Sequence, residues 1–339
     1  MLAYVVNAPY DGNLCERETP RIAADEVLVR VRAASVCHSD LDIIEGRRVH
    51  SLTLPVILGH EFAGEIIETG ADIKDLKIGM AVGCECIIWC GRCRACLAGD
   101  TSRCENFNEL GTMRDGGFAE YAAVPSHMVH RLRGLPADEA SNLEPAGNGF
   151  HAAEACGIRE GDAVAVIGPG PIGLYAMQCA ALYKPDKLIM AGTRKNRLET
   201  AKLLGATHTV NVSETDAYKS IIDITEGKGA DRVIQCATTP EANALAVKIL
   251  GSNSVLAMEG YGGGTLNMAF NDFLQKPVSI LGVTGVSHRH FKETLAAAES
   301  GKIKIAPVIT HRFPLCKIEE AFKLMKDKNA NAIKIVINP

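Results

Sequence analysis

The chain is predicted to fold as an α/β protein in which a β-rich domain is joined to a doubly wound parallel-sheet domain. Two changes of pattern along its 339 residues lead to this prediction. Short strand-like runs, separated by Gly, Pro and Asp, fill residues 1–150. Strand-like and helix-like runs alternate over residues 151–285, which is typical of βαβ units and a parallel sheet. The alternation ends there, so residues 286–339 form a third segment.

The composition is that of a folded globular protein, with 47% hydrophobic and 22% charged residues. A formal net charge of −4 does not indicate a basic surface for nucleic acid or for an anionic membrane. No apolar run approaches the roughly 20 residues that a membrane-spanning helix needs. The first residues lack the basic and apolar regions of a secretory signal, so we expect a cytoplasmic location.

A glycine-rich loop near the start of the second domain predicts a dinucleotide site. A GxGxxG motif directly follows the apolar run Ala163–Ile167 and precedes an Ala-rich helical stretch. Its glycines allow a tight turn, close approach of a pyrophosphate and close helix packing, while the helix N-terminus favours phosphates. A glycine-rich turn without a ligand is the alternative, and the βα-like units that follow argue against it. The predicted cofactor contacts are Gly168, Gly170, Pro171, Ile172 and Gly173.

The end of the second strand favours NADP over NAD. An NAD-binding unit normally carries an acidic residue there for the ribose 2′-hydroxyl. This chain instead has Gly192, Thr193, Arg194 and Lys195. The missing carboxylate removes repulsion toward a 2′-phosphate, and Arg194 can pair with that phosphate bidentately. The alternative is that Arg194 and Lys195 are only the solvated start of a helix.

Four closely spaced cysteines predict a structural zinc site in a lobe at about residues 84–110. Cys90, Cys93, Cys96 and Cys104 supply four soft thiolates, which make a closed tetrahedral site with no position for substrate. Iron–sulfur ligation is a competing interpretation. A nucleic-acid-binding zinc ribbon is another, and the acidic balance of the chain and the few nearby arginines oppose it.

A second set of metal-binding residues is scattered along the chain. Cys37, His60 and Glu144, with Glu61 next to His60, combine thiolate, imidazole and carboxylate groups. Such a mixed set is typical of catalytic zinc, which keeps one position for water or substrate. Spacing alone does not establish this site, because His60 could be a buried structural histidine and Cys37 a small buried hydrophobe. His130 and His288 have no spacing that predicts a ligand role.

Several motifs occur in one order along essentially the whole chain: Gly59-His60-Glu61-x2-Gly64-x5-Gly70-x2-Ile73, the four-cysteine stretch, Gly116-Gly117-Phe118-Ala119-Glu120-Tyr121 and the glycine loop. This order resembles that of zinc-containing medium-chain alcohol dehydrogenases. The pair Glu144-Pro145 resembles the Glu-Pro or Asp-Pro pair that sorbitol, galactitol-phosphate and threonine dehydrogenases carry at this place. The resemblance implies a GroES-like β-rich catalytic domain, completed by residues 286–339, and an inserted Rossmann domain. It also implies a homodimer or homotetramer that binds a small alcohol or ketone between its domains.

The resemblance implies two zinc ions per chain, one catalytic and one structural. Cys37, His60 and Glu144 would bind the catalytic zinc, and the four closely spaced cysteines would bind the structural one. Glu61 would act as an exchanging or supporting carboxylate, and Asp40 would orient His60.

The resemblance also implies that Ser39 begins a proton relay, because it stands two residues after Cys37. The alternative is an ordinary turn serine. Many relatives carry a histidine five residues after the cysteine, and this chain has Asp42 there. The rest of the relay is therefore not defined by the resemblance.

The predicted reaction is hydride transfer between NADP(H) and a secondary alcohol or polyol, or the matching ketone. The Arg-Tyr pair of sorbitol dehydrogenases is replaced by Gly282–Val286, with no arginine before Arg289, so a sorbitol-like pocket is not supported in detail. Arg47 and Arg48 could meet a sugar phosphate or form a solvated basic loop. The segment Pro145–Asn148 is similar to threonine dehydrogenases, which keeps an NAD-dependent amino-alcohol dehydrogenase as an alternative. A non-enzymatic binding protein on this fold would lack the zinc ligands that this chain keeps.

Overall fold

The computed structural model describes residues 1–48, 51–260, 264–327 and 329–339. These residues divide into two compact units. The first unit comprises Met1–Glu144, Val286–Ser300 and Ile309–Pro339. The second unit comprises Pro145–Gly285 and Gly301–Val308.

The unit boundaries lie a few residues away from the predicted segments. Helix α4 (Leu143–Ala155) runs across the first boundary, and a continuous helix produces no change of pattern where the second unit begins. Residues 301–308, expected with the C-terminal segment, belong to the second unit. Lys304 ties them there, because its N–H donates to Gln178 Oε1 at 2.7 Å and its carbonyl accepts from Gln178 Nε2 at 3.1 Å.

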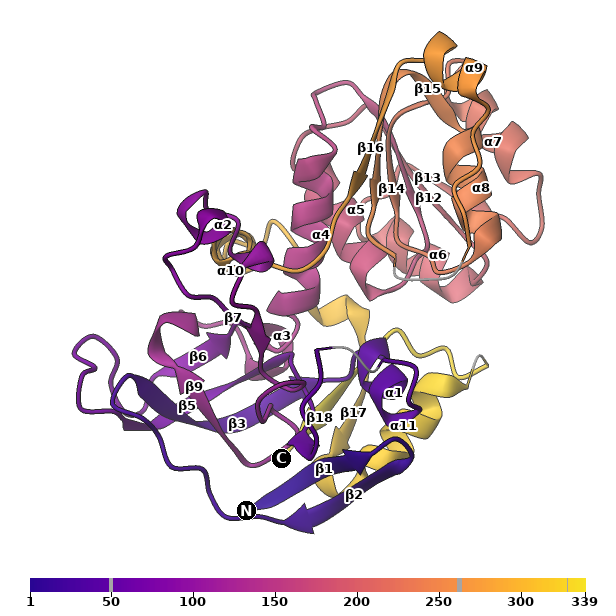
Figure 1. Ribbon diagram of the computed structural model, residues 1–339. Helices are drawn as coiled ribbons and strands as arrows, with labels where there is room; N and C mark the ends of the chain where they lie inside the picture. Colours follow the sequence, from indigo (N-terminus) through magenta and orange to yellow (C-terminus); the bar gives the residue numbers. More distant parts are fainter. Residues whose placement is uncertain (49–50, 261–263, 328) are drawn as a thin grey trace. The chain divides into compact units, whose positions relative to one another are not determined.

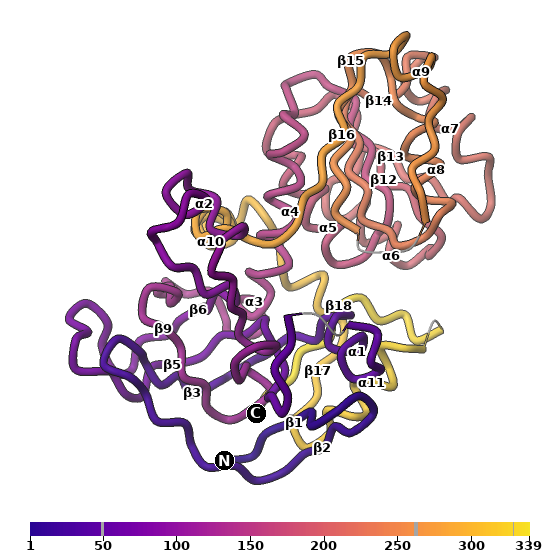
Figure 2. The backbone as a smooth tube through the Cα atoms, in the orientation of Figure 1, coloured from indigo at the N-terminus to yellow at the C-terminus, as the bar shows by residue number. Residues whose placement is uncertain are grey.

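One mixed sheet is the frame of the first unit, in the order β10-β6-β5-β3-β18-β17, with β9 also paired to β3. The last strand of the chain, β18, runs antiparallel to β3 and places Val336 opposite Ser35. Both ends of the chain therefore build this unit, as its indigo and yellow segments show (Figure 2). The strands are β3 (Glu26–Ser35), β5 (Phe62–Thr69), β6 (Ala81–Cys84), β9 (Tyr121–Pro125), β10 (Val129–Arg131), β17 (Ile309–Pro314) and β18 (Lys334–Asn338).

Smaller elements complete the first unit. A three-stranded sheet has the order β2-β1-β4, and β7 pairs with β8. In the core, the rings of Tyr4 and Phe118 pack edge to face on Phe322, with centroids 5.2 and 5.9 Å from it. These elements are β1 (Leu2–Ala8), β2 (Asp11–Glu16), β4 (Val56–Ile57), β7 (Ile87–Ile88), β8 (Asn108–Glu109), α1 (His38–Ile44), α2 (Arg94–Leu97), α3 (Ala137–Ala140), α10 (His288–Glu299) and α11 (Ile318–Lys326), with 3-10 turns η1 (Thr101–Arg103), η2 (Ser126–Met128) and η4 (Leu315–Lys317).

The second unit is a parallel sheet of six strands in the order β13-β12-β11-β14-β15-β16, with helices on both faces (Figure 1). The chain changes direction across the sheet between β11 and β14, and doubly wound sheets bind ligands at this switch point. Its strands are β11 (Ala163–Ile167), β12 (Lys187–Gly192), β13 (His208–Asn211), β14 (Ala230–Gln235), β15 (Leu250–Met258) and β16 (Val278–Gly282). Besides α4, its helices are α5 (Pro171–Ala181), α6 (Lys195–Leu203), α7 (Ala217–Ile224), α8 (Pro240–Lys248) and α9 (Phe270–Gln275), with the 3-10 turn η3 (Ala306–Val308).

The predicted fold class is confirmed. The helix after the glycine loop begins at Pro171, because proline suits the first position of a helix. Helix α10 begins at His288, where Ser287 caps it. Within the described ranges, no helix has both the length and the apolar character needed to cross a membrane.

Candidate active site

The glycine loop lies between β11 and α5, at the switch point of the parallel sheet. Gly168 has a φ of +101°, and a Cβ there would lie 2.8 Å from the Ala237 nitrogen. A Cβ on Gly173 would lie 2.0 Å from the Gly168 carbonyl oxygen, so this glycine lets α5 begin against the strand. A Cβ on Gly170 would meet only Arg197 Nη1 among the described residues, at 4.0 Å, which leaves the loop open to a ligand. The other two predicted contacts, Pro171 and Ile172, form the first turn of α5.

The end of β12 brings guanidinium groups to this loop. Gly192 packs so closely on the loop that a Cβ would lie 2.2 Å from Pro169 Cδ. Arg194 is the N-cap residue of α6, and Arg197 lies on its first turn. Burial, together with the charge of Arg194, lowers the pKa of Arg197 to about 10. An anion placed here would offset both the burial of the Arg197 charge and its repulsion by Arg194. The remaining predicted contacts, Thr193 and Lys195, are exposed.

Three possible metal ligands from separate elements converge in the first unit. Cys37 precedes α1, and His60 and Glu61 precede β5. One donor atom of each side chain lies within 4.8 Å of the other two, and His60 Nε2 lies 3.9 Å from Glu61 Oε1. Two N or O ligands of a tetrahedral zinc, each about 2.1 Å from the ion, lie about 3.4 Å apart, which is close to this spacing. Glu61 Oε1 is buried and has no hydrogen-bond partner among the described residues, so it is available to an ion.

Buried charged groups hold these ligands in place. Asp40 Oδ1 lies 3.6 Å from His60 Nδ1, and the other ring nitrogen of His60, Nε2, faces Glu61. The other oxygen of Glu61 accepts from Lys334 Nζ at 2.5 Å and from the Ser35 hydroxyl. Burial alone would lower the pKa of Lys334, but the charge of Glu61 raises it above its usual value. Lys334 therefore stays charged and fixes one oxygen of Glu61.

The ligand group attracts positive charge. Burial alone would lower the pKa of His60, but the charges of Cys37 and Asp40 outweigh it and raise that pKa well above its usual value. The thiol and carboxyl groups around the imidazole therefore favour a positive charge at this place. A divalent cation matches this surplus of negative charge, so the donor set and the electrostatics both fit zinc.

Glu144 and Ser39 lie close to this group. Glu144 is buried in the first turn of α4, with Oε1 3.9 Å from Cys86 Sγ, and it contributes to the raised pKa of Lys334. Among the described residues it lies outside the cluster whose donor atoms share the 4.8 Å limit. Ser39 is half-buried in the first turn of α1, directly before Asp40. The structure thus gives Glu61 the place nearest to the cysteine and the histidine.

The two arginines that follow α1 pair with carboxylates of α1 and β8. Arg47 Nη2 lies 2.6 Å from Asp42 Oδ1, and Arg48 Nη2 lies 2.9 Å from Glu109 Oε2. Both arginines that could have met an anionic substrate are therefore paired with carboxylates. The carboxylate that stands in place of the relay histidine is likewise engaged by Arg47.

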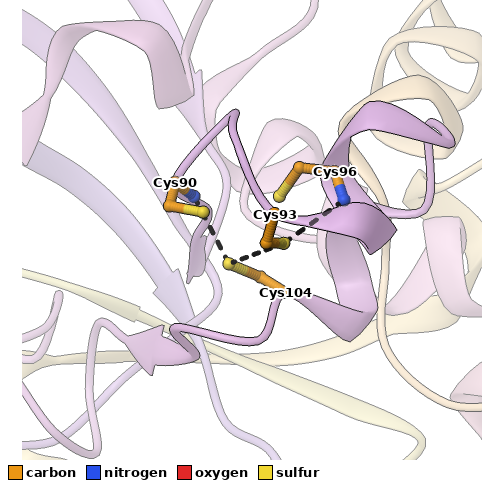
Figure 3. A group of neighbouring side chains, drawn as sticks. All are labelled: Cys90, Cys93, Cys96 and Cys104. Carbon is orange, nitrogen blue, oxygen red and sulfur yellow. Dashed lines mark hydrogen bonds between the residues drawn. The ribbon is translucent and has the colours of Figure 1, made fainter.

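The four closely spaced cysteines form a second group, and their sulfur atoms face one another (Figure 3). Cys93 Sγ lies 4.0 Å from Cys104 Sγ. Two thiolates about 2.3 Å from a tetrahedral zinc would lie about 3.8 Å apart, which agrees with this distance. Backbone N–H groups point at the sulfurs: Cys90 donates to Cys104 at 3.4 Å, and Cys96 donates to Cys93 at 3.5 Å. The arrangement fits a closed tetrathiolate zinc site.

The lobe around these cysteines has little apolar packing. Helix α2 has no buried residue, and Leu97 within it is 76% exposed. The N–H of Arg92 and the amide of Asn106 lower the pKa of Cys90 to about 6, so this thiol ionises near neutral pH. A bound metal would supply the cohesion that a core supplies elsewhere.

Sequence reasoning missed two residues that position the ligands. Ser35, at the end of β3, and Lys334, at the start of β18, both bind Glu61. Lys334 did carry a signal, because it is the one charged residue in the apolar run 332–337. A charged side chain in such a strand is buried only with a partner. Its partner could not be identified without the pairing of β18 with β3.

The chain matches two family models. Residues 23–134 match the alcohol dehydrogenase GroES-like domain, and residues 171–300 match the zinc-binding dehydrogenase domain. An L-threonine 3-dehydrogenase from Pyrococcus abyssi is 33% identical over 336 residues, which cover 96% of this chain and 95% of that protein.

Solved structures of similar proteins span the same length. An NADP-bound zinc-binding dehydrogenase from Sinorhizobium meliloti has a TM-score of 0.94 at 27% identity and covers 100% of this chain and 99% of that one. Galactitol-1-phosphate dehydrogenase from Escherichia coli has a TM-score of 0.91 at 29% identity, with 100% of both chains covered. With both domains matched, the chain belongs to the zinc-containing medium-chain alcohol dehydrogenase family.

Proposed function

We propose that this protein transfers a hydride between NADP(H) and a secondary alcohol or polyol, or the matching ketone. The observation that carries the proposal is the convergence of Cys37, His60 and Glu61, with one oxygen of Glu61 buried and unpaired. The same chain carries a glycine loop with the geometry of a dinucleotide site. A mixed thiolate, imidazole and carboxylate set with an open position is typical of catalytic zinc.

Zinc held by Cys37, His60 and Glu144 would supply a Lewis acid for the oxygen of an alcohol or ketone. The chain's own groups keep that position organised. Asp40 orients His60, and Lys334 holds one oxygen of Glu61. The free oxygen of Glu61 makes it an exchanging carboxylate, which can take a ligand position when substrate enters or leaves. The four closely spaced cysteines would hold the structural zinc.

We propose that Ser39 is the first group to accept the proton that the substrate releases. It is half-buried, two residues after Cys37, on the turn that begins α1. A hydroxyl there can accept a proton from the substrate while it donates its own proton to solvent water, so no further charge is brought to the ligand group. Asp42 is engaged by Arg47, so we leave it out of the relay.

The preference for NADP rests on Arg194 and Arg197. A 2′-phosphate beside Arg194 would gain charge-assisted hydrogen bonds and offset the repulsion that lowers the pKa of Arg197. Residues 193–198, directly after β12, contain no carboxylate that would repel the phosphate or hold the hydroxyl of NAD.

An NAD-dependent oxidation of a threonine-like amino alcohol is the second candidate. The similarity to a threonine 3-dehydrogenase over nearly the whole chain favours it. The pairing of Arg47 with Asp42 and of Arg48 with Glu109 also weakens the case for a phosphorylated substrate, because neither guanidinium is free of a carboxylate.

We also propose that the chain self-associates through the edge of its parallel sheet. Strand β16 ends the sheet, and large apolar side chains on β16 and α9 are exposed. Phe270 is 74% exposed and Leu274 is 60% exposed, which is typical of a protein interface. Phe270→Glu combined with Leu274→Glu should reduce the mass measured by light scattering, whereas Leu203→Glu on exposed α6 should not. An unchanged mass would contradict this interface.

One experiment tests the reaction and distinguishes the candidates. The zinc-loaded chain is assayed with secondary alcohols, polyols, sugar-alcohol phosphates and threonine, each with NADP and with NAD. We expect the highest kcat/KM for an unphosphorylated secondary alcohol or polyol with NADP. Turnover of threonine with NAD would establish the second candidate, and turnover of none of these substrates would contradict both.

A further inference from the structure

The first unit holds another cluster of potential ligands, which shares no residue with the Cys37 group or with the four closely spaced cysteines. Glu85 follows β6, His130 lies on β10, and His288 is the first residue of α10. Strand β10 pairs with β6, and His130 lies opposite Gly83 in that register. The cluster therefore joins three segments that are distant in sequence.

The two imidazoles meet on one oxygen. Glu85 Oε1 lies 2.5 Å from His130 Nε2 and 2.6 Å from His288 Nδ1. One donor atom from each of the three side chains lies within 4.8 Å of the other two. Glu85 is only 3% exposed, and its Oε2 is buried with no hydrogen-bond partner among the described residues. A buried, half-satisfied carboxylate flanked by two imidazoles is a costly arrangement unless a cation joins it.

We propose that Glu85, His130 and His288 form a third metal site, which binds a divalent transition-metal ion of the zinc class. Two imidazoles and one carboxylate are a ligand set that zinc, cobalt and nickel accept, whereas calcium and magnesium prefer oxygen ligands alone. The set leaves a fourth position to water. The site is additional to the zinc ions of the proposed function and does not depend on that function.

A cation can reach this cluster from solvent. His130 and His288 line a surface depression together with His127. Burial is the largest influence on His127 and lowers its pKa, so this third imidazole is neutral at neutral pH and does not repel a cation. The charged side chains of the depression are Asp25, Asp72, Lys74, Asp75 and Lys292, in which the acids outnumber the lysines.

Occupancy would fasten helix α10 to the rest of the first unit. The N–H of His288 donates to Thr101 Oγ1, in the lobe of the four closely spaced cysteines, at 2.7 Å. The ring of His288 also packs on His130, with centroids 5.2 Å apart. A metal on both rings would tie the start of α10 to the sheet, next to the point where the chain re-enters this unit at Val286.

The chain contains its own probe for this site. Its one tryptophan, Trp89, packs against His127 at 4.7 Å and against His288 at 5.3 Å between ring centroids. A paramagnetic ion bound to His288 should quench the fluorescence of Trp89. The full-length protein, loaded with two zinc ions per chain and freed of excess zinc, is titrated with Ni²⁺ in the presence and absence of added Zn²⁺, and tryptophan emission is recorded.

We expect saturable quenching that Zn²⁺ competes away. Glu85→Gln and His288→Asn should each raise the Ni²⁺ midpoint at least about 10-fold, the loss that follows removal of even an outer partner of a metal ligand. His208→Asn, in the second unit, should leave the midpoint unchanged. His288→Asn changes a side chain that is 32% exposed, so it tests the site even where Glu85→Gln prevents folding.

Two results would overturn the proposal. One is the absence of saturable quenching in the native chain. The other is quenching with the same midpoint in the folded His288→Asn variant, which would place the nickel at the neighbouring cysteines. In both cases the cluster would be a hydrogen-bonded group that holds α10 without a metal.

Discussion

The four-cysteine lobe and the Cys37–His60–Glu61 cluster offer metal ligands in opposite ways. The cysteines of the lobe all lie between residues 90 and 104, and little buried apolar surface surrounds them. The ligands of the other cluster lie on the segments that follow β3 and precede β5, and Lys334 from the last strand binds Glu61. Its side chains lie in a tightly packed part of the molecule, where His60 and Glu61 are nearly inaccessible.

This contrast separates a site in which the metal would organise the chain from a site in which the folded chain organises the metal ligands. In the lobe, a bound metal would have to create the structure, because helix α2 has no buried residue and offers little core to gather four thiolates. In the dispersed cluster, the folded sheet would create the metal site, because hydrogen bonds and ion pairs already hold Asp40, His60 and Glu61. The lobe should therefore lose its fold with its metal, and the dispersed cluster should lose its metal with little loss of fold.

The largest expected effect is the loss of stability of the four-cysteine lobe in Cys104→Ser. Structural zinc sites carry about 10 kcal/mol or more of apparent binding free energy, and that energy is folding energy. Zinc content should fall by one ion per chain, and amide protection should disappear in the lobe while the second unit keeps its own. Metal analysis gives the zinc content, and hydrogen exchange with mass spectrometry gives the amide protection of the lobe and of the second unit. Exposed Cys316→Ser is the matched control. Full protection of the lobe after loss of its zinc would break the comparison.

Cys37→Ala should remove the catalytic metal and leave the fold. We expect kcat/KM to fall on the order of 1,000-fold or more, because a Lewis acid contributes several kcal/mol to the barrier. The thermal unfolding midpoint of the first unit should change little, unlike that of the lobe variant. Metal analysis and calorimetry check these outcomes, and global unfolding of this variant would show that the dispersed site also needs its metal to fold.

Lys334→Met should destabilise the first unit by about 3 kcal/mol, since it leaves Glu61 buried without its ion-pair partner. Lys334 is distant in sequence from Glu61, so this substitution tests a long-range contact. The cysteines of the lobe, in contrast, all lie between residues 90 and 104. Chemical denaturation of the metal-loaded chain gives the free energy of unfolding. Lys334→Arg should keep most of the stability, and equal losses in both variants would point to packing in place of charge.

Ser39→Ala should lower turnover on the order of 100-fold, the usual scale for a lost proton-transfer group. Zinc content and the KM for the cofactor should not change. Steady-state kinetics as a function of pH, with metal analysis of the same sample, test this. Unchanged turnover would remove Ser39 from the mechanism and leave the turn-serine interpretation.

The smallest expected effect is on cofactor binding, in a variant at the start of α6. Arg194→Ala should raise the KM for NADP about 10-fold, the worth of one charge-assisted contact, and leave the KM for NAD unchanged. Lys202→Ala, at the other end of the same helix, is the control. An equal rise for both cofactors would show that Arg194 does not recognise the 2′-phosphate.

Local sequence patterns were sufficient to predict the glycine loop, the strand before it and the four-cysteine group. The apolar run Ala163–Ile167 and the glycine motif after it predicted β11 and the loop, because each depends on neighbours in sequence. The spacing of Cys90 to Cys104 predicted a tetrathiolate group for the same reason. A resemblance to a family was needed for the dispersed ligands, since nothing local relates Cys37 to His60.

The tertiary structure decided what distant segments do to one another. Only the antiparallel pairing of β18 with β3 brings Lys334 to Glu61, and only the pairing of β10 with β6 brings His130 to Glu85. The burial of these charges and the unpaired carboxylate oxygens follow from the same pairings. Sequence therefore determined the chemistry that each segment carries. The fold determined which chemistries meet, because ligand geometry and electrostatics depend on distances in space.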